Sequence, residues 1–293
     1  MDRIGFIGLG VMGGHMARHL SGRYDLVVYD VDEKRMAALE GVRKAGTVEV
    51  VAQNASVVLL SLPGSEIVRE VVAGESGLAG AMPAGGVVID TSTTEPAVSR
   101  SLSKLLAKKG IGFLDAPVSG GEAAAREATL SIMVGGPEEV FNKHKHILEA
   151  IGKSVVRVGD TGAGEVAKLV NNMIVGSAFA VIAESFALGI KNGLDPAVLY
   201  EAIKDGWAGS KVLDVAVSGT IKRDFVPGGS VDIHCKDLGY ALSLAGSQSV
   251  PVPMTAVANE IFKAARASGR GPYAQHIIIE LWEELLEKNG GKR

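Results

Sequence analysis

Short apolar runs alternate with amphipathic stretches through the first half of the chain. We expect strands at the apolar runs Arg3 to Gly8, Leu26 to Asp30, Val57 to Leu62, Val87 to Asp90, Gly112 to Ala116, Leu130 to Val134 and Val155 to Val158. We expect helices between them at Val11 to Ser21, Glu33 to Leu39, Glu66 to Val72, Ala97 to Lys109 and Glu138 to Ile151. Strands that are apolar throughout are typical of a parallel sheet with helices on both faces. The pattern therefore predicts an α/β fold with a doubly wound, mainly parallel sheet.

The pattern changes after Gly162, where strand-like runs almost disappear. A helix is expected from Gly164 to Asn192, which would extend roughly 45 Å at about 1.5 Å per residue. Its apolar part is long enough to cross a membrane, but Glu184 and two serines interrupt it, so we expect a buried helix. Further helices are expected at Pro196 to Lys204, Lys236 to Ser247, Thr255 to Ala267 and Tyr273 to Lys288. The chain is thus predicted to hold an α/β domain over residues 1–162 and an all-helical domain over residues 163–293, which begins with the long interdomain helix.

The composition is that of a soluble globular protein. Of 293 residues, 47% are hydrophobic and 22% are charged, and 38 are glycines that stand mostly in turns between the apolar runs. The formal net charge of −3 gives no reason to expect nucleic acid or an anionic membrane as a partner. Cys235 is the single cysteine and no secretory signal pattern is present, so we expect a cytoplasmic protein without an intramolecular disulfide.

A glycine-rich turn follows the first expected strand and precedes an amphipathic helix. It reads Gly8-Leu9-Gly10-Val11-Met12-Gly13 and has the G-x-G-x-x-G spacing. The three glycines permit a tight turn, the approach of a pyrophosphate and close packing of helix on strand, and the helix N-terminus attracts phosphates. The alternative is a turn that only packs strand against helix, but Asp30 ends the next strand, where a carboxylate can bind the ribose hydroxyl. The turn therefore predicts a Rossmann-type, NAD-binding domain.

Asp30 also bears on the choice between NAD and NADP. A carboxylate repels a 2′-phosphate, and Val31 follows Asp30 where an arginine would favour that phosphate. Lys34 and Arg35 begin the next helix and are interpreted as a solvated face. We therefore predict NAD as the cofactor.

The histidines give no reason to predict a metal site. His15 and His19 are four residues apart on the first helix, but no third ligand stands near them in the sequence. His144 and His146 point to different faces of a helix that is interpreted as solvated. We expect no bound metal.

A glycine turn between Asp115 and Gly121 ends an expected strand. It should lie at the carboxyl edge of the sheet, where open α/β sheets bind their ligands. Ser119 and the backbone N–H groups of Gly120 and Gly121 would there bind a substrate carboxylate. The alternative is a plain strand-to-helix turn.

Lys168 and Asn172 lie four residues apart on the long helix and so share one face. The following turns are apolar, so we expect this face to look into a cleft between the domains. A lysine held partly out of water gives up its proton more readily and can act as acid or base on an alcohol. On composition alone, Lys236 and Asp237 are interpreted as surface charge.

Six segments, taken together, resemble successive motifs of the β-hydroxyacid dehydrogenases, the 3-hydroxyisobutyrate dehydrogenase-like family that is related to 6-phosphogluconate dehydrogenase. They are GFIGLGVMGGHMARHL, SLPGSEIV, DTSTTEP, DAPVSGGEAAAREATLSIMVGG, GAGEVAKLVNN and HCKDLGYAL, in the family's order from residue 4 onward. The resemblance implies that Lys168 is the catalytic acid and base. It further implies that Ser119, Gly120, Gly121 and Asn172 bind substrate, and that Leu62, Pro63, Thr93 and Lys236 border the nicotinamide half of the cofactor. A homodimer or homotetramer is implied as well.

The substrate is predicted less sharply than the reaction. The run from Trp207 to Asp214, followed by Phe225-Val226-Pro227-Gly228, resembles the tartronate semialdehyde reductases (2-hydroxy-3-oxopropionate reductases), whereas Val31 departs from their NADP-preferring members. Oxidation of 3-hydroxyisobutyrate, L-threonate or 2-(hydroxymethyl)glutarate, or scavenging of semialdehydes, remain alternatives. A dinucleotide-binding sensor without catalysis is the alternative outside enzymes, since a fold does not by itself imply a reaction.

Overall fold

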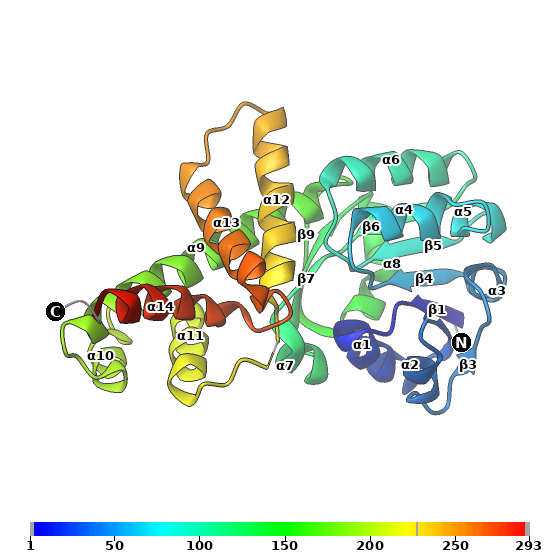
Figure 1. Cartoon of the computed structure of the whole chain (residues 1–293). Coiled ribbons are helices and arrows are strands. Elements are labelled where there is room, and N and C mark those ends of the chain that lie inside the picture. The colour runs from blue at the N-terminus through cyan, green and yellow to red at the C-terminus, as the bar shows by residue number, and fades with distance from the viewer. Residues whose placement is uncertain (1–2, 227, 291–293) are drawn as a thin grey trace. The chain divides into compact units, whose positions relative to one another are not determined.

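The computed structural model describes residues 3–226 and 228–290 of the chain, so Pro227 of the predicted substrate motif lies outside the described residues. The chain divides into two compact units, residues 1–168 and 169–293. The first unit is built around a sheet, and the described part of the second is helical (Figure 1).

A nine-stranded sheet forms the centre of the first unit. Its strands are β1 (Arg3–Ile7), β2 (Asp25–Tyr29), β3 (Arg43–Lys44), β4 (Val57–Leu60), β5 (Val87–Asp90), β6 (Gly112–Asp115), β7 (Val118–Ser119), β8 (Leu130–Gly135) and β9 (Gly152–Gly159). Their order is β3-β2-β1-β4-β5-β6-β8-β7, and β9 pairs with β8. Strands β1 to β6 pair in parallel, whereas β8 runs antiparallel to β6 and β7. The order reverses between β1 and β4, and ligands of open α/β sheets bind outside the carboxyl ends of the strands at such a switch point.

Alternate residues of each strand supply two separate apolar layers. On one face Phe6 and Leu59 pack beneath α1 (Val11–Ser21), α2 (Glu33–Ala37) and α8 (Glu138–Leu148). On the other face Val58 and Leu60 pack beneath α3 (Val48–Asn54), α4 (Ser65–Ala73), α5 (Leu78–Ala81) and α6 (Pro96–Ala107). Both faces of the sheet are therefore covered by helices (Figure 1), which explains why its strands are apolar throughout.

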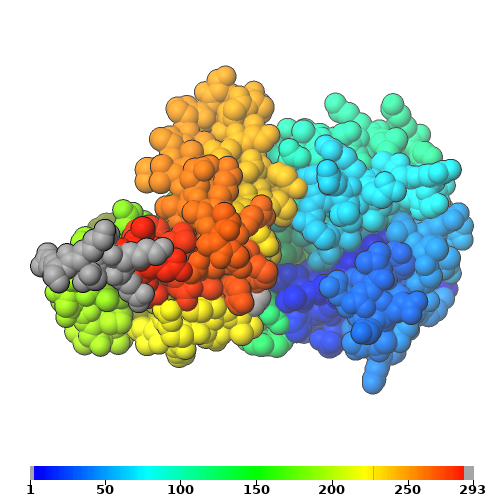
Figure 2. Space-filling view, in the orientation of Figure 1, coloured from blue at the N-terminus to red at the C-terminus, as the bar shows by residue number. Residues whose placement is uncertain are grey.

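The second unit packs its helices around one aromatic and aliphatic core. Its elements are α9 (Ala163–Lys191, which begins in the first unit), α10 (Pro196–Ile203), α11 (Lys211–Lys222), α12 (Val231–Ser247), α13 (Pro253–Ala265), the π-helical turn η1 (Arg266–Arg270), the 3₁₀ turn η2 (Gln275–Ile278) and α14 (Ile279–Gly290). Helices α12 and α13 lie side by side (Figure 1, Figure 2). Helix α9 is long and apolar enough to cross a membrane by length and composition alone. However, its Phe179 and Phe186 are buried against Leu238 and Phe262, so it is a core helix of this unit.

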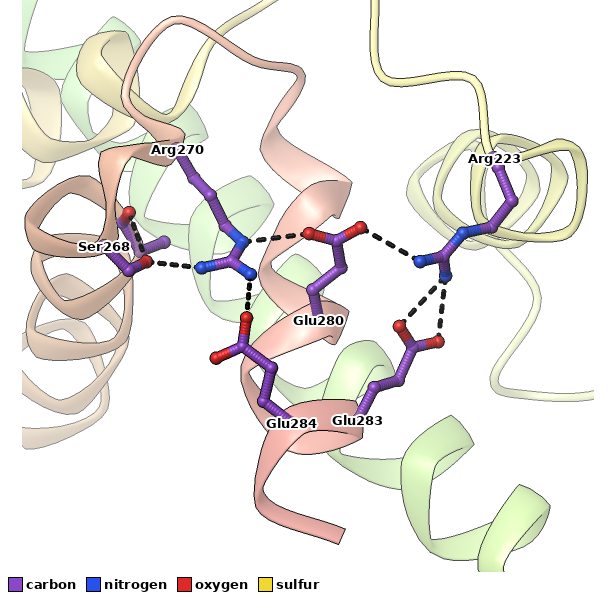
Figure 3. A network of polar contacts seen from close by, with 7 residues as sticks. Arg223, Ser268, Arg270, Glu280, Glu283 and Glu284 are labelled. Carbon is purple, nitrogen blue, oxygen red and sulfur yellow. Dashed lines mark hydrogen bonds and ion pairs between the residues drawn. The ribbon is translucent and has the colours of Figure 1, made fainter. Parts of the chain in front are cut away.

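An ionic network fastens the end of α11 and the turn η1 to α14 (Figure 3). Arg223, in the left-handed conformation at the end of α11, donates to Glu280 at 2.9 Å and to both carboxylate oxygens of Glu283. Arg270 donates to Glu280 at 2.9 Å from its other side and also contacts Glu284. One carboxylate, that of Glu280, therefore joins two arginines that are far apart in the sequence.

The predicted fold class is confirmed, and the differences lie in two strands, four helices and the surroundings of individual side chains. The prediction missed the two-residue strands β3 and β7 and the helices α3, α5, α7 (Gly121–Arg126) and α11. Helix α11 is rich in β-branched valine, which has low helix propensity, so packing and the Ser210 cap decide its conformation. The interpretation of His144 as solvated is wrong, because that side chain is buried and its Nδ1 lies 2.9 Å from the Val140 carbonyl oxygen.

Candidate active site

The glycine turn between β1 and α1 is shaped by contacts that only glycine permits. Gly8 has a φ of +93°, and a side-chain carbon there would come within 2.3 Å of the Ser61 carbonyl oxygen. A side-chain carbon on Gly13 would come within 2.0 Å of the Gly8 carbonyl oxygen. At Gly10, in contrast, the nearest atom to such a carbon is Nη1 of Arg35, at 3.8 Å. The turn is therefore open at Gly10, the N-cap of α1, where a pyrophosphate fits against the helix N-terminus.

The carboxylate of Asp30 accepts hydrogen bonds from the backbone of this turn and of the residues after β2. Its Oδ2 accepts a hydrogen bond from the Leu9 N–H at 2.6 Å, and its Oδ1 accepts one from the Asp32 N–H at 2.8 Å. Asp30 is 5% exposed. Val11 and Met12 are the first two residues of α1. The carboxylate thus lies beside the predicted ribose position and also fixes the backbone of the loop.

Arg35 lies against the same carboxylate. The interpretation of Arg35 as part of a solvated face did not predict this ion pair. Its Nη1 is 3.5 Å from Asp30 Oδ2, and its Nε is 3.5 Å from Asp32 Oδ2. The Arg35 side chain is 51% exposed. A cation therefore offsets part of the negative charge at the position predicted to select the cofactor.

The loops that follow β4 and β5 are hydrogen-bonded to each other. The N–H of Leu62 donates to Ser92 Oγ at 2.9 Å, and the N–H of Glu95 donates to Ser65 Oγ at 3.0 Å. Because β4 and β5 are parallel neighbours, both loops leave the carboxyl edge of the sheet together. These loops carry the three residues predicted to border the nicotinamide half of the cofactor, Leu62, Pro63 and Thr93.

Ser119 stands on a short strand of its own. The chain leaves β6 after Asp115, and Ser119 ends β7, where it pairs with Ser131 of β8. Gly120 and Gly121 follow with φ values of +132° and +70°, which glycine adopts without strain. Both glycines are exposed at the start of α7, and Ser119 is half-buried. The two glycines of this turn are therefore in contact with solvent.

The first turn of α9 is fixed to the carboxyl end of β6. The carboxylate of Asp115 accepts hydrogen bonds from the N–H groups of Gly162 at 2.7 Å and Glu165 at 3.1 Å. Burial raises the pKa of Asp115, and these backbone donors oppose the increase. A side-chain carbon on Gly164 would lie 2.6 Å from the Asp115 carbonyl oxygen, so glycine is required for this close approach. Lys168 follows one turn later on the same helix and is 9% exposed.

In the second unit a buried carboxylate joins Asn172 to Lys236. Asn172 Nδ2 donates to Asp237 Oδ2 at 2.6 Å, and Lys236 Nζ lies 2.7 Å from Asp237 Oδ1. Asp237 is 2% exposed, so its interpretation as surface charge is wrong. Its position was detectable, because Asp237 follows the buried His234 by three residues and precedes the buried Ala241 by four, as residues on one helical face do.

The predicted site residues therefore form two groups. The first unit holds, at or near the carboxyl edge of its sheet, the glycine turn with Asp30, the loops with Leu62, Pro63 and Thr93, the Ser119 turn and Lys168. The second unit holds Asn172 and Lys236, both bonded to Asp237. Among the side chains of residues 3–226 and 228–286, His, Cys, Asp and Glu form no group of three or more that could hold a metal ion.

Comparison with protein families matches the two parts of the chain separately. Residues 3–159 match the NAD-binding domain of 6-phosphogluconate dehydrogenase. Residues 162–282 match the family described as "NAD-binding of NADP-dependent 3-hydroxyisobutyrate dehydrogenase".

Similar sequences cover nearly the whole chain. A 2-(hydroxymethyl)glutarate dehydrogenase of Eubacterium barkeri is 39% identical over 99% of this chain and 98% of its own length. A 3-hydroxyisobutyrate dehydrogenase of Pseudomonas aeruginosa is 38% identical over 89% of this chain and 91% of its own. A 2-hydroxy-3-oxopropionate reductase of Escherichia coli is 34% identical over 96% and 97%.

Two solved structures share the architecture over nearly their full length. A 3-hydroxyisobutyrate dehydrogenase from Mycobacterium tuberculosis with L-serine has a TM-score of 0.87 at 30% identity, covering 96% of this chain and 99% of that one. A 3-hydroxyisobutyrate dehydrogenase from Salmonella typhimurium also has a TM-score of 0.87, at 28% identity, covering 96% and 100%.

Proposed function

This chain belongs to the 3-hydroxyisobutyrate dehydrogenase-like β-hydroxyacid dehydrogenases, and from that premise we propose that it interconverts a small β-hydroxy acid and its semialdehyde with Lys168 as acid and base. It is an NAD-dependent oxidoreductase with a Rossmann-type domain followed by a helical domain. The observation that carries the proposal is the placement of Lys168. This lysine is 9% exposed and lies one turn after a helix start that is bonded to the carboxyl edge of the sheet.

The reaction needs one proton transfer and one hydride transfer. In oxidation, neutral Lys168 takes the proton of the substrate hydroxyl through Nζ, and the carbinol hydrogen leaves with its electron pair as the C–O bond becomes a carbonyl. The nicotinamide ring, when bound, supplies the acceptor of that hydride. In reduction, the Lys168 ammonium returns the proton to the developing alkoxide. One amine serves both directions, because it accepts in oxidation the proton that its ammonium form returns in reduction.

Substrate orientation is assigned to the Ser119 turn and to Asn172. The N–H groups of Gly120 and Gly121, with the Ser119 hydroxyl, would bind the carboxylate and so fix the carbon β to it. Asn172 would hold the reacting hydroxyl, with its amide orientation set by the Asp237 carboxylate. The space at Gly10 and the Asp30 carboxylate would take the pyrophosphate and ribose of NAD. The family resemblance assigns Leu62, Pro63, Thr93 and Lys236 to the nicotinamide half.

As substrate we propose tartronate semialdehyde, with D-glycerate as the reduced acid. The support is the likeness of residues 207–228 to that group and the 34% identity to the Escherichia coli 2-hydroxy-3-oxopropionate reductase. 2-(Hydroxymethyl)glutarate is the second candidate, supported by 39% identity over nearly the whole chain. Part of the motif has a local structural role, because Ser210 caps α11 and Gly209 permits a tight turn. Substrate choice therefore requires a direct comparison.

The test measures the absorbance of reduced nicotinamide. In the direction of oxidation, NAD is mixed with each of D-glycerate, 3-hydroxyisobutyrate, L-threonate, 2-(hydroxymethyl)glutarate and L-serine. In the direction of reduction, NADH is mixed with tartronate semialdehyde. We expect the highest kcat/KM with the glycerate pair. The highest value with 2-(hydroxymethyl)glutarate would favour the second candidate. NAD binding without turnover of any member would favour a dinucleotide-binding sensor.

The role of Lys168 is tested by substitution. We expect Lys168→Ala to lower kcat by about a hundredfold to ten-thousandfold while the Kd for NAD stays within about twofold. Lys191→Ala, an exposed lysine at the other end of α9, is the matched control and should leave kcat unchanged. Near-native turnover of Lys168→Ala would contradict the assignment.

We further propose that the functional domains are residues 1–162, which bind NAD, and residues 163–293, which bind substrate and form the contacts of a homodimer or homotetramer. The boundary is supported by the point where the two family matches meet. A cytoplasmic location is proposed from the single cysteine, Cys235.

A further inference from the structure

The side chain of Glu165 is completely buried in the first turn of α9. Its Oε2 accepts a hydrogen bond from the Thr94 N–H at 3.0 Å, and its Oε1 lies 3.1 Å from Thr94 Oγ1. Thr94 Oγ1 is in turn 3.2 Å from Ser99 Oγ in α6. Thr94 belongs to the loop after β5, so one glutamate side chain fastens this loop to the start of α9.

Two other buried carboxyl groups act on Glu165. Asp90 ends β5 and Asp115 ends β6, and both are fully buried. Burial, and then the charges of Asp90 and Asp115, raise the pKa of Glu165 well above its usual range, although the Thr94 hydrogen bonds oppose this. Both carboxyl oxygens are satisfied by Thr94. Oε2 accepts from the Thr94 amide and Oε1 accepts from the Thr94 hydroxyl, whose Oγ1 also lies within hydrogen-bond distance of Ser99 Oγ.

The Glu165 bridge completes a set of hydrogen bonds around the carboxyl edge of the sheet. The loop after β5 is already bonded to the loop after β4 through Leu62 and Ser92. Glu165 adds the third member, the helix turn that leads to Lys168 three residues later. Thr93 precedes Thr94 and is expected beside the nicotinamide. The hydrogen bonds of Thr94 therefore connect the loop that carries Thr93 to the helix turn that leads to Lys168.

We propose that Glu165 is a positioning residue, whose hydrogen bonds to Thr94 hold Lys168 in register with the loop that carries Thr93. Glu165 does not itself touch substrate in this account. It acts by keeping the lysine and the cofactor-side loop at a constant separation within the first unit. The proposal rests on the proposed role of Lys168, and a displacement of about 1 Å in such an arrangement can cost about a hundredfold in rate.

The experiment compares three variants at the site with one control. Glu165→Gln keeps a neutral group that can accept from the Thr94 amide and donate to Thr94 Oγ1, so we expect kcat within about twofold of wild type. Glu165→Ala removes the bridge, and we expect kcat to fall by about tenfold to a hundredfold, with the KM for the hydroxy acid changed less than about threefold. Thr94→Val keeps the backbone donor and loses only the hydroxyl, and should give an intermediate fall in kcat. Glu184→Gln, exposed on the same helix, should match wild type.

The pH profile separates positioning from a purely structural role. As the pH rises through the raised pKa of Glu165, its charge meets those of Asp90 and Asp115, so the hydrogen bonds around Thr94 should loosen and kcat should fall. Glu165→Gln cannot ionise, so its alkaline limb should extend to higher pH. Glu165→Gln as inactive as Lys168→Ala would overturn the proposal, because it would make the carboxyl a proton carrier. Native kcat in both Glu165→Ala and Thr94→Val would also overturn it.

Two readouts do not depend on catalysis and so distinguish this proposal from failure of the proposed function. In difference infrared spectra across a pH titration, the C=O stretch of the Glu165 carboxylic acid should persist to higher pH than that of a solvent-exposed glutamate, and it should be missing in Glu165→Gln. Loss of this band in wild type at the pH of an exposed glutamate would contradict the raised pKa. For stability, a raised folded pKa means that the folded state binds more protons than the unfolded one between the two pKa values. Wild type should therefore lose stability relative to Glu165→Gln as pH rises above the unfolded pKa, and a pH-independent difference would contradict this.

Discussion

A single guanidinium lies beside the carboxylate that is expected to select the cofactor. Arg35 is 3.5 Å from Asp30, and half of its side chain is exposed. An exposed arginine can turn toward a 2′-phosphate and offset the repulsion that Asp30 exerts on it. We predict that Arg35→Ala lowers kcat/KM with NADP by about tenfold or more, since hydrogen bonds to charged groups are worth about 1.5–3 kcal/mol, while kcat/KM with NAD changes less than about threefold. Steady-state rates with both cofactors measure this. Lys34→Ala, an exposed neighbour on α2, is the control, and equal losses with NAD and NADP would contradict the prediction.

Asp237 fixes the amide of Asn172, and Asn172 is proposed to hold the substrate hydroxyl. We predict that Asp237→Ala raises the KM for the hydroxy acid by about tenfold to a hundredfold, because the freed Asn172 amide loses a charge-assisted hydrogen bond of about 1.5–3 kcal/mol. The Kd for NAD, measured by calorimetry, indicates whether Lys236 also needs this carboxylate. Asp232→Ala removes a half-exposed carboxylate of the same helix that pairs with Arg266, and it should leave KM unchanged. An unchanged KM in Asp237→Ala would remove Asp237 from the site.

At the residue scale, the sequence predicted side chains whose backbone context is local and missed those whose partners are distant. Gly8, Gly10 and Gly13 follow from one short turn between a strand and a helix. Glu165 depends on Thr94, 71 positions away in the chain, and no local pattern connects the two. Asp237 depends on Asn172, 65 positions away, and its interpretation as surface charge overlooked that it shares a helical face with the apolar Ala241.

At the scale of elements, the hydrophobic pattern was sufficient where every residue of a strand is apolar and buried. The apolar strands β4 and β5 begin where predicted, because helices cover both of their faces. The strands β3 and β7 were not predicted, because a strand of two residues shows no alternation of apolar and polar positions. β7 matters for the site, because it places Ser119 beside β8 and not at the end of a parallel strand.

The ionic network of Figure 3 offers a test of how the helices of the second unit are held. Glu280 is 23% exposed and contacts both Arg223 and Arg270, and the Arg270 side chain is 13% exposed. We predict that Glu280→Ala lowers the free energy of unfolding by about 1–2 kcal/mol, because Arg223 and Arg270 both lose a carboxylate partner at a position that is only partly exposed to solvent. Chemical denaturation measures it. Glu260→Ala breaks the exposed pair with Lys263 and should cost no more than about 0.5 kcal/mol, and equal costs for the two variants would contradict the argument.

At the scale of the whole molecule, helix α9 leaves an apolar stripe exposed. Ile174, Val181 and Leu188 are 67%, 53% and 67% exposed, and their spacing of seven residues places them on one face. Exposed apolar stripes of this kind mark protein–protein contacts in soluble proteins. A second copy of the chain is the partner that the proposed homo-oligomer supplies.

The stripe therefore predicts where the proposed oligomer can be broken. In light scattering coupled to size exclusion, wild type should have the mass of a dimer or tetramer, and Val181→Glu should have a lower mass, because a charge in an apolar interface is costly to desolvate. Val215→Glu places the same charge on α11, at a valine that is 51% exposed, and should leave the mass unchanged. A monomeric wild type would refute the homo-oligomer. An unchanged mass in Val181→Glu, with the control also unchanged, would place the interface elsewhere.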